Sequence, residues 1–489
     1  MQEFASKVKE MLGNKALVLA SSSEPYVNYF EEEEIRWRRG TGGVVTALEP
    51  VMRSCHGTWI AHGSGEADRE LVGNDGKMQL PPGENSYTLR RLFFSKKEQD
   101  GFLSGVANGA LWPLSHVVYV RPRFIDEQWE IFRGVNRKFA EAISADTGKA
   151  DAITWINDYQ LVLAAKYLKE MEPEGISAYF WHIPWPNPQV FKVCPWHEEI
   201  LDAMLSNDLI GFNTPYYASN FLESVDQTLE ARIDKVTSTV VYKGREISVV
   251  AEPISVDYRG IQAFSEKVQE SAVVKVAKKY GLRKGVVAIG VDRMDYTKGL
   301  PEKIKAIDLV LTRHPEMAEE LTLVQIASPT RIHLPEYQQF NEELETLAEE
   351  VNWRHSTGSW KPVILDIRYA SPEEIYSLYK IAGICLVTSL HDGMNLVSKE
   401  YVASKTDGRG VLILSRFAGA STELKDALPV NPYSVNEIAD AIEKAIGMPV
   451  AERQERMKRM QEEISRNDVF AWAQRFLEKA VRKGVGQKL

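Results

Sequence analysis

Two cations stand close together in the stretch AIGVDRMDYTKGLPEK (288–303). The stretch begins as an apolar strand, and Pro301 is typical of a helix start. Arg293 and Lys298 therefore lie between a strand end and a helix N-terminus, where free backbone N–H groups attract anions. Arginine offers a planar fork and lysine a mobile point charge, so the pair could neutralise a diphosphate.

The same two cations would also fit a surface ion network, because Asp292 and Asp295 stand beside them. Spacing alone does not choose between the two interpretations. The stretch contains no GxxxxGK[ST] motif, so it does not indicate an ATPase loop.

A second candidate loop is VTSLHDGMNLVSKEYV (387–402). Gly393 would let the backbone approach a ligand closely, and Asn395 could cap the following helix. Glu400 would lie on that helix, where its carboxylate could accept two ribose hydroxyls. The alternative is an ordinary capped helix with Glu400 on a solvated face. The small residues of LSRFAGASTEL (414–424) predict a third loop with an accessible backbone.

The first half offers a glycine-rich turn, RRGTGGVVTALEP (38–50), which enters a helix. It is not a GxGxxG motif and does not support a dinucleotide site. Gly42 and Gly43 could let a sugar or phosphate lie against the helix N-terminus, although an ordinary turn would need the same residues.

Three further candidates lie in the first half, and two of them lie at the ends of predicted strands. Asp158 comes directly after the strand in INDYQL, and His182 ends the strand in FWHIPWPNP. A lone histidine is more often structural, but a partner at a neighbouring strand end makes it a binding candidate. Trp112 could stack on a sugar ring, although a buried core tryptophan is the commoner fate.

Composition limits the partners of the chain. The 489 residues carry a net charge of −9, which argues against a general binder of nucleic acids or anionic membranes. Three cysteines without a CxxC pair fit a reducing compartment, and nine histidines form no HxxxH or HExxH cluster. No signal peptide and no long apolar run is recognisable, so we expect a cytoplasmic protein without a membrane span.

The elements that must position these residues alternate between apolar strands and amphipathic helices, which predicts an α/β fold with parallel sheets. The length favours two doubly wound domains facing across a cleft. We expect an N-terminal domain over 1–254, a C-terminal domain over 255–467 and a last helix, about 468–489, that packs back on the first. Predicted strands cover 16–21, 58–63, 117–122, 152–157, 177–184, 209–214, 285–291, 321–328, 362–367, 383–389 and 410–415.

Five segments together resemble a known family. GVDRMDYTKGLPEK, DGMNLVSKEYV, LSRFAGASTEL, FWHIPWPNP and NDYQL are similar to signature segments of the trehalose-6-phosphate synthases. These are retaining glycosyltransferases of the GT-B architecture, with two Rossmann-like domains. The resemblance runs in order from about residue 15 to 480, and the first two segments are long and specific.

The resemblance implies roles for the matching residues. Arg293 and Lys298 would hold the diphosphate of a nucleoside-diphosphate glucose, and Glu400 would take its ribose hydroxyls. His182 would bind the sugar, and Asp158 with Trp112 would line the acceptor pocket. Arg331 would reach the acceptor phosphate. The remaining donor contacts implied are Gly42, Gly43, Asp392, Gly393, Met394, Asn395, Leu396 and Val397.

The implied chemistry needs neither a metal nor a covalent nucleophile, since the two cations stabilise the leaving diphosphate. The acceptor hydroxyl would attack from the face that the diphosphate leaves, which retains configuration. The substrates would be a nucleotide sugar and a sugar phosphate. The base of the donor is left open, and its expected contact is the backbone around 365–369. A homo-oligomeric state is also left open.

The acceptor-phosphate site departs from the family pattern. Ser23 stands where an arginine is usual, Leu103 where a tyrosine is usual, and Gln160 where a histidine is usual. Arg331 remains, so the acceptor-phosphate site is reduced and not erased, and Arg36, Arg38 or Arg39 could compensate. Three hypotheses follow: a synthase acting on glucose 6-phosphate; a related transferase with another acceptor, such as a glucosylglycerol-phosphate synthase or a pseudo-glycosyltransferase; and a sugar-nucleotide-binding regulator without turnover.

Overall fold

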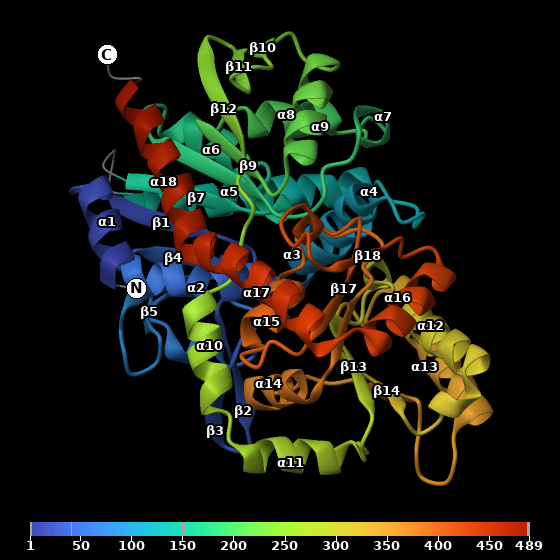
Figure 1. Cartoon of the computed structure of the whole chain (residues 1–489). Helices are drawn as coiled ribbons and strands as arrows, with labels where there is room; N and C mark the ends of the chain where they lie inside the picture. Colours follow the sequence, from blue (N-terminus) through green and yellow to red (C-terminus); the bar gives the residue numbers. More distant parts are fainter. Residues whose placement is uncertain (1, 41, 148–151, 487–489) are drawn as a thin grey trace. The chain divides into compact units, whose positions relative to one another are not determined.

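The computed structural model describes residues 2–40, 42–147 and 152–486, and it divides into two compact units. Unit 1 comprises residues 1–254 and 469–489, and unit 2 comprises residues 255–468. Each unit is built on a largely parallel sheet with helices in the connections, as the alternation of strands and helices predicts (Figure 1).

The sheet of unit 1 has the strand order β10-β11-β12-β9-β8-β7-β1-β4-β6-β5. The pairs β10–β11, β11–β12 and β5–β6 are antiparallel, and the other described pairs are parallel. In that order the strands span Arg232–Asp234, Thr239–Tyr242, Arg245–Ala251, Leu209–Phe212, Ile176–Trp181, Ala152–Asn157, Ala16–Ala20, Thr58–His62, Tyr87–Leu92 and Lys77–Leu80. A separate hairpin consists of β2 (Tyr26–Glu31) and β3 (Glu34–Arg39).

The helices of unit 1 fill the connections between these strands. They are α1 (Gln2–Leu12), α2 (Gly43–Cys55), α3 (Lys96–Gln99), α4 (Trp112–His116), α5 (Asp126–Thr147), α6 (Ala164–Met171), α7 (Pro188–Phe191), α8 (His197–Met204), α9 (Pro215–Asp226) and α18 (Val469–Gly486). The segment η2 (Asp100–Leu111) is wound as a π-helix, and η1 (Asp68–Leu71) and η3 (Tyr159–Leu161) are short 3-10 turns.

The last helix, α18, belongs to the core of unit 1 although it follows unit 2 in the sequence (Figure 1). Its Trp472 and Phe476 are fully buried. Their rings lie 5.2 Å from that of Trp155 on β7, and Phe476 also lies 5.2 Å from Phe180 on β8. The apolar stripe read in the C-terminal sequence is therefore a packing face.

The sheet of unit 2 has the order β15-β14-β13-β16-β17-β18, with all described pairs parallel. In that order the strands span Val363–Asp366, Leu321–Ser328, Val286–Arg293, Ile384–Val387, Val411–Ser415 and Leu428–Val430. The helices are α10 (Tyr258–Lys267), α11 (Glu270–Lys279), α12 (Leu300–Arg313), α13 (Pro335–His355), α14 (Pro372–Ile381), α15 (Leu396–Ser404), α16 (Val435–Gly447) and α17 (Val450–Arg466). Three short turns, η4 (Tyr296–Lys298), η5 (Pro315–Met317) and η6 (Gly419–Thr422), complete the unit.

Burial explains why the central strands read as unbroken apolar runs. All residues of β7, β8 and β16 are buried, and so are the first seven of β14. A strand covered by helices on both faces has no solvated side and shows no polar alternation. These central strands therefore carry apolar residues on both faces.

One predicted strand is wrong. The predicted strand 117–122 is irregular, because Val117 and Tyr119 adopt left-handed backbone angles, with φ of 53° and 63°, that a strand cannot contain. Helix α17 ends at Arg466 and α18 begins at Val469, where the chain passes from unit 2 to unit 1.

None of the helices in the described ranges is both long and apolar enough to cross a membrane.

Candidate functional site

In unit 2 the strand order reverses between β13 and β16. The chain leaves β13 toward β14 and β15 on one side, and places β16, β17 and β18 on the other. Ligands of doubly wound sheets bind beyond the carboxyl ends of the strands at such a switch point. The loops after β13 and β16 are the two loops that the sequence singles out.

The two loops are joined by their backbones. The N–H of Leu390 donates to the carbonyl of Thr297 at 2.8 Å, and the Thr388 hydroxyl donates to the carbonyl of Gly299 at 2.9 Å. Gly299 has φ of 63°, and a Cβ there would lie 2.1 Å from the Thr388 carbonyl oxygen. Only glycine permits this approach, which brings the cationic loop against the loop that carries Asp392.

Lys298 and Asp392 form an ion pair across these loops, with 2.6 Å between Nζ and Oδ2. The same Oδ2 accepts hydrogen bonds from the Ser389 hydroxyl and the Asn395 amide, each at 3.1 Å. Both charged side chains are largely buried, at 11% and 12% exposure. The ammonium is therefore held in place by a carboxylate from a distant strand end.

The neighbouring aspartates have other partners. Asp292 pairs with the buried Lys303, and Asp295 accepts from Arg331 at 3.0 Å. Burial alone would raise the pKa of Asp295, but the charges of Arg331 and Arg293 lower it well below its usual range. A surface network of Lys298 with Asp292 or Asp295 is therefore not what the structure shows.

Arg331 lies in a strained backbone conformation, with φ of 50°. Its Nη1 contacts both Asp295 and the hydroxyl of the buried Tyr337. The side chain is 9% exposed, so its guanidinium is fixed within unit 2. Its predicted contact with an acceptor phosphate stays a prediction.

The segment 392–397 forms the entry to helix α15. Asn395, with φ of 77°, caps the helix by accepting from the N–H of Ser398 at 2.9 Å, as the sequence predicts. Leu396 and Val397 open the helix, where N–H groups lack intrahelical partners. These amides, with the helix dipole, provide a local positive end that suits a phosphate.

The third loop supports the second. The N–H of Asp392 donates to the carbonyl of Phe417 at 3.1 Å, and the N–H of Ala420 donates to the carbonyl of Met394 at 2.8 Å. A buried ion pair between Lys399 and Glu423, at 2.7 Å, ties α15 to the same loop. The small residues of 414–424 thus hold the segment from Asp392 to Asn395 in position.

Glu400 lies on α15 and is partly exposed. Burial raises the pKa of its carboxyl to about 7. Within the described parts of the chain, no residue donates a hydrogen bond to this carboxylate or forms an ion pair with it. A half-buried carboxyl without a protein donor is suited to accept hydroxyls from a ligand.

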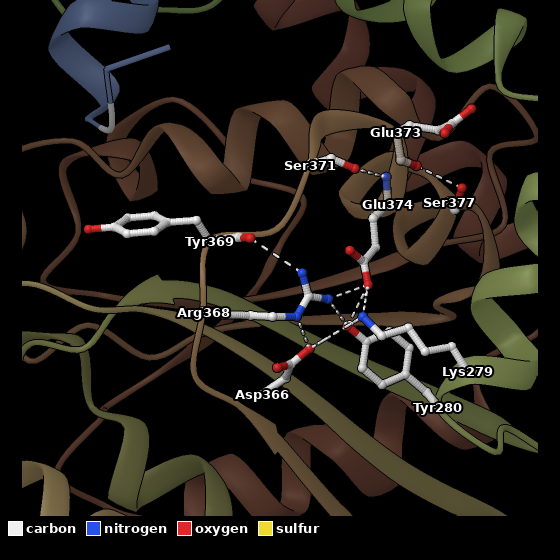
Figure 2. Close-up of polar contacts among 9 residues, drawn as sticks. All are labelled: Lys279, Tyr280, Asp366, Arg368, Tyr369, Ser371, Glu373, Glu374 and Ser377. Atoms are coloured by element: carbon white, nitrogen blue, oxygen red, sulfur yellow. Dashed lines mark hydrogen bonds and ion pairs between the residues drawn. The ribbon is translucent and has the colours of Figure 1, made fainter. Parts of the chain in front are cut away.

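The segment 365–369, expected to contact a nucleobase, is held by an ion cluster at the end of β15 (Figure 2). Arg368 Nε donates to Asp366 at 2.9 Å, and Nη2 contacts Glu374 and the Tyr280 hydroxyl. Burial alone would raise the pKa of Glu374, but hydrogen bonds from Arg368 and Lys279 lower it to about 2. The Arg368 side chain is thus paired within the unit, and contact of this segment with a nucleobase stays a prediction.

In unit 1 the strand order reverses between β1 and β7, and two predicted residues meet beside that point. Asp158 follows β7 with φ of 72°, and its Oδ1 accepts the N–H groups of Tyr159 at 3.0 Å and His182 at 3.2 Å. Strained backbone of this kind is concentrated at functional sites. The strand-end pair of Asp158 and His182 is thus in direct contact.

Trp112 opens helix α4 and is nearly buried. Its ring centroid lies 3.9 Å from that of His116 and 5.9 Å from that of Tyr159. Gly42, with φ of 153°, precedes α2, and Gly43 is the first residue of that helix. Their roles in the acceptor and donor sites stay predictions, as do those of the other predicted site residues.

The segment with Ser23 is held by a buried cluster that the sequence did not reveal. Arg91 on β6 donates to Glu24 at 2.7 Å and lies 3.0 Å from Asp68. Burial and the nearby Asp68 raise the pKa of Glu24, because one guanidinium faces two carboxylates. Glu24 also accepts from the N–H and hydroxyl of Ser64, both at 2.8 Å. A glutamate directly after a strand-end serine run was the available signal.

Two of the arginines expected to compensate for Ser23 have carboxylate partners in this structure. Arg36 pairs with Glu34 at 2.6 Å on the exposed hairpin β2–β3, and Arg39 lies 3.8 Å from Glu49. Among the described residues, groups of three or more histidine, cysteine, aspartate or glutamate side chains that could hold a metal are not found.

Comparisons with known proteins agree with this architecture. The family model of glycosyltransferase family 20 matches residues 14–482. A trehalose-6-phosphate synthase of Mycolicibacterium smegmatis is 34% identical over 461 residues, covering 92% of this chain and 89% of the relative.

Solved structures show the same fold. An alpha,alpha-trehalose-phosphate synthase (UDP-forming) of Burkholderia xenovorans, solved with glucose-6-phosphate, superposes with a TM-score of 0.85 at 27% identity, covering 95% of this chain and 99% of that one. An E. coli protein bound with UDP-2-fluoro glucose superposes with a TM-score of 0.84 at 26% identity, covering 96% and 99%. The predicted α/β fold class of the GT-B kind is confirmed, and the chain belongs to glycosyltransferase family 20, the trehalose-6-phosphate synthase family, and is a glycosyltransferase.

Proposed function

We propose that this glycosyltransferase moves glucose from a nucleoside-diphosphate glucose to glucose 6-phosphate, with retention of configuration, and so makes trehalose 6-phosphate. The observation that carries the proposal is the meeting of Lys298 and Asp392 at the switch point of unit 2, beside the amides that open α15. The relatives named as trehalose-6-phosphate synthases support the product, and one solved relative holds glucose-6-phosphate.

The chemistry of the donor follows from the charges in unit 2. Negative charge grows on the diphosphate as its bond to the anomeric carbon breaks. Lys298, Arg293 and the first amides of α15 are the groups available to stabilise that charge, and preorganised groups of this kind usually lower the barrier more than any other effect. Asp392 would hold Lys298 until the diphosphate arrives and then contact the glucose. Glu400 would accept the ribose hydroxyls.

Two cations make a divalent metal unnecessary in this proposal, because they neutralise the charge that Mg²⁺ would otherwise neutralise. The acceptor hydroxyl would attack from the side of the departing diphosphate, whose oxygen takes the hydroxyl proton. His182 and Asp158 in unit 1 would orient the sugars.

A second candidate is transfer to another acceptor, and Ser23 is the observation that favours it. Arg91, which contacts the residue next to Ser23, is bound to Glu24 and Asp68, so it does not replace the usual arginine at that position. Losing a charge-assisted contact costs roughly 1.5–3 kcal/mol, and two such losses would weaken binding of glucose 6-phosphate by orders of magnitude.

The deciding experiment incubates the chain with UDP-, GDP- and ADP-glucose against a panel of acceptors, and identifies the products by mass and NMR. Trehalose 6-phosphate with an α,α linkage would support the proposal, and an inverted linkage would contradict retention. Turnover with another acceptor alone would favour the second candidate. Tight nucleotide binding without turnover would indicate a regulator.

The donor assignment has its own test. Lys298→Ala is expected to lower kcat/KM by about 100-fold or more, as for other lost transition-state donors. Lys305→Ala removes an exposed lysine of α12 and serves as the matched control, with activity expected within about twofold. Near-normal activity of Lys298→Ala would refute the diphosphate contact.

A further inference from the structure

The side chain of Asn157 is fully buried at the carboxyl end of β7. Its Nδ2 donates to the carbonyls of Trp155, at 3.3 Å, and Ala20, at 3.5 Å. Both partners can only accept, so the amide nitrogen must face them and the amide oxygen must face the opposite way. The contact with Ala20 also joins β7 to β1 at the switch point of unit 1.

The oxygen of this amide faces the ring of His182, with 3.0 Å between Oδ1 and Nε2. An amide oxygen can only accept, so Nε2 must carry the hydrogen. Burial lowers the pKa of His182 to about 3, so the ring is neutral and has one N–H. Nδ1 must therefore be the unprotonated nitrogen.

Nδ1 is the unused atom of this arrangement. It is buried and has no hydrogen-bond partner among the described residues. The backbone of His182 is held on both sides, by Asp158 at its N–H and by Asn213, which donates to its carbonyl at 2.8 Å. The ring packs on Phe180, with 4.5 Å between ring centroids. A rigidly held ring with one unpaired buried acceptor is suited to a ligand donor, because an unpaired acceptor is costly.

We infer that Asn157 is a positioning residue, which selects the Nε2–H tautomer of His182 so that Nδ1 accepts a hydrogen bond from a hydroxyl of the bound sugar. This inference rests on the proposed function, in which His182 contacts the sugar. Asn157 acts through the histidine and does not touch the substrate. Its removal should therefore change the tautomer as well as the rate.

The spectroscopic arm of the test uses histidine labelled with ¹⁵N and long-range ¹H–¹⁵N spectra, with His182→Gln assigning the signals. Wild type is expected to show a protonated Nε2 and an unprotonated Nδ1. Asn157→Leu should lose this preference, while Asn157→Asp, which keeps an acceptor opposite Nε2, should keep that proton. A protonated Nδ1 in wild type would overturn the inference.

Asn213→Leu is the matched control, since it makes the same chemical change beside the same histidine. Asn213 contacts the backbone carbonyl of His182 and not its ring. We expect this variant to lower the melting temperature without changing the tautomer. A tautomer shift of equal size in Asn213→Leu would show that general loosening, and not Asn157, is responsible.

The kinetic arm is a double-mutant cycle. Asn157→Leu should lower kcat/KM by about tenfold or more, because the wrong tautomer removes the acceptor. In the His182→Ala background the same change should cost less than about twofold. Equal losses in both backgrounds would overturn the inference. If wild type transferred no glucose, the proposed function would fall, and the spectra would still decide the tautomer.

Discussion

Glu400 shows how a single residue can report on ligand binding. Its carboxyl is partly exposed, lies inside helix α15 and has a pKa raised to about 7 by burial. The charged form is costly in this place until a donor reaches it. Hydroxyls of a ribose are donors of the required kind.

Donor affinity should therefore depend on pH through Glu400. The carboxylate is the form that accepts two hydroxyls, so nucleotide affinity should fall as pH drops below about 7, by up to roughly tenfold per pH unit. Calorimetric titration of a nucleoside diphosphate between pH 5.5 and 8.5 measures this. Because the ligand phosphate also titrates, the comparison is with Glu400→Gln, which should show a shallower slope. Equal slopes would exclude Glu400 from the binding site.

The two cations Arg293 and Lys298 lead to a prediction about metals. If they neutralise the diphosphate, dialysis against EDTA should leave the transfer rate within about twofold, since preorganised cations replace the ion. The rate is measured with and without added Mg²⁺. A rate that falls with EDTA and returns with Mg²⁺ would require a metal in the donor site.

At the scale of elements, helix α12 is joined to β13 and β14 by a buried polar cluster. Lys303 is fully buried and contacts Asp292 on β13 and Gln325 on β14, the latter at 3.3 Å. Gln325 in turn donates to Asp292 at 3.1 Å. The cluster lies at the carboxyl end of β13, where Arg293 is the next residue.

Removing only one charge of this cluster should lower the free energy of unfolding. Lys303→Met leaves the Asp292 carboxylate buried without its cation, and we expect a loss of about 3–5 kcal/mol in unfolding free energy. Denaturant titration measures the loss. The double variant Lys303→Met/Asp292→Leu removes both charges and should recover part of it. Lys305→Met, on the exposed face of α12, is the control and should change stability by less than about 0.5 kcal/mol.

At the scale of the molecule, the chain visits unit 1, then unit 2, and returns to unit 1 through α18. Glu252, just before the first passage, pairs with Arg475 at 2.9 Å, and its carbonyl accepts from Trp472 at 3.2 Å. The end of the sequence is therefore needed to complete the core of the first unit.

Trp472→Ala should destabilise unit 1 by about 3–5 kcal/mol, because the lost ring leaves a cavity against Trp155 and Phe180. Hydrogen exchange measured by mass spectrometry should show faster exchange in β7 and β8, while β13 and β14 keep their protection. The matched control is Trp353→Ala in unit 2, since that ring is 89% exposed. Loss of protection in β13 to the same degree would contradict the assignment of α18 to unit 1.

Prediction from the sequence succeeded where the signal lies within a few consecutive residues. Asn395 caps α15, and Pro301 lies at the start of α12, as expected. Strands buried on both faces were recognised from unbroken apolar runs. Strand 117–122 failed because apolar residues in a loop with left-handed backbone angles look like a strand in the sequence. The hairpin β2–β3 was missed, since its second strand is charged and exposed and lacks an apolar pattern.

The sequence by itself determined the family, the α/β class and the loops that follow the strands, because these depend on local spacing and on long contiguous motifs. Only the tertiary structure decided which groups meet. Lys298 pairs with Asp392, 94 residues away, and not with the aspartates beside it. Asn157 orients His182, and Arg91 holds Glu24, because the order of strands in a sheet makes neighbours of distant strand ends. Partners of this kind are set by packing in three dimensions, and residue spacing along the chain carries no record of them.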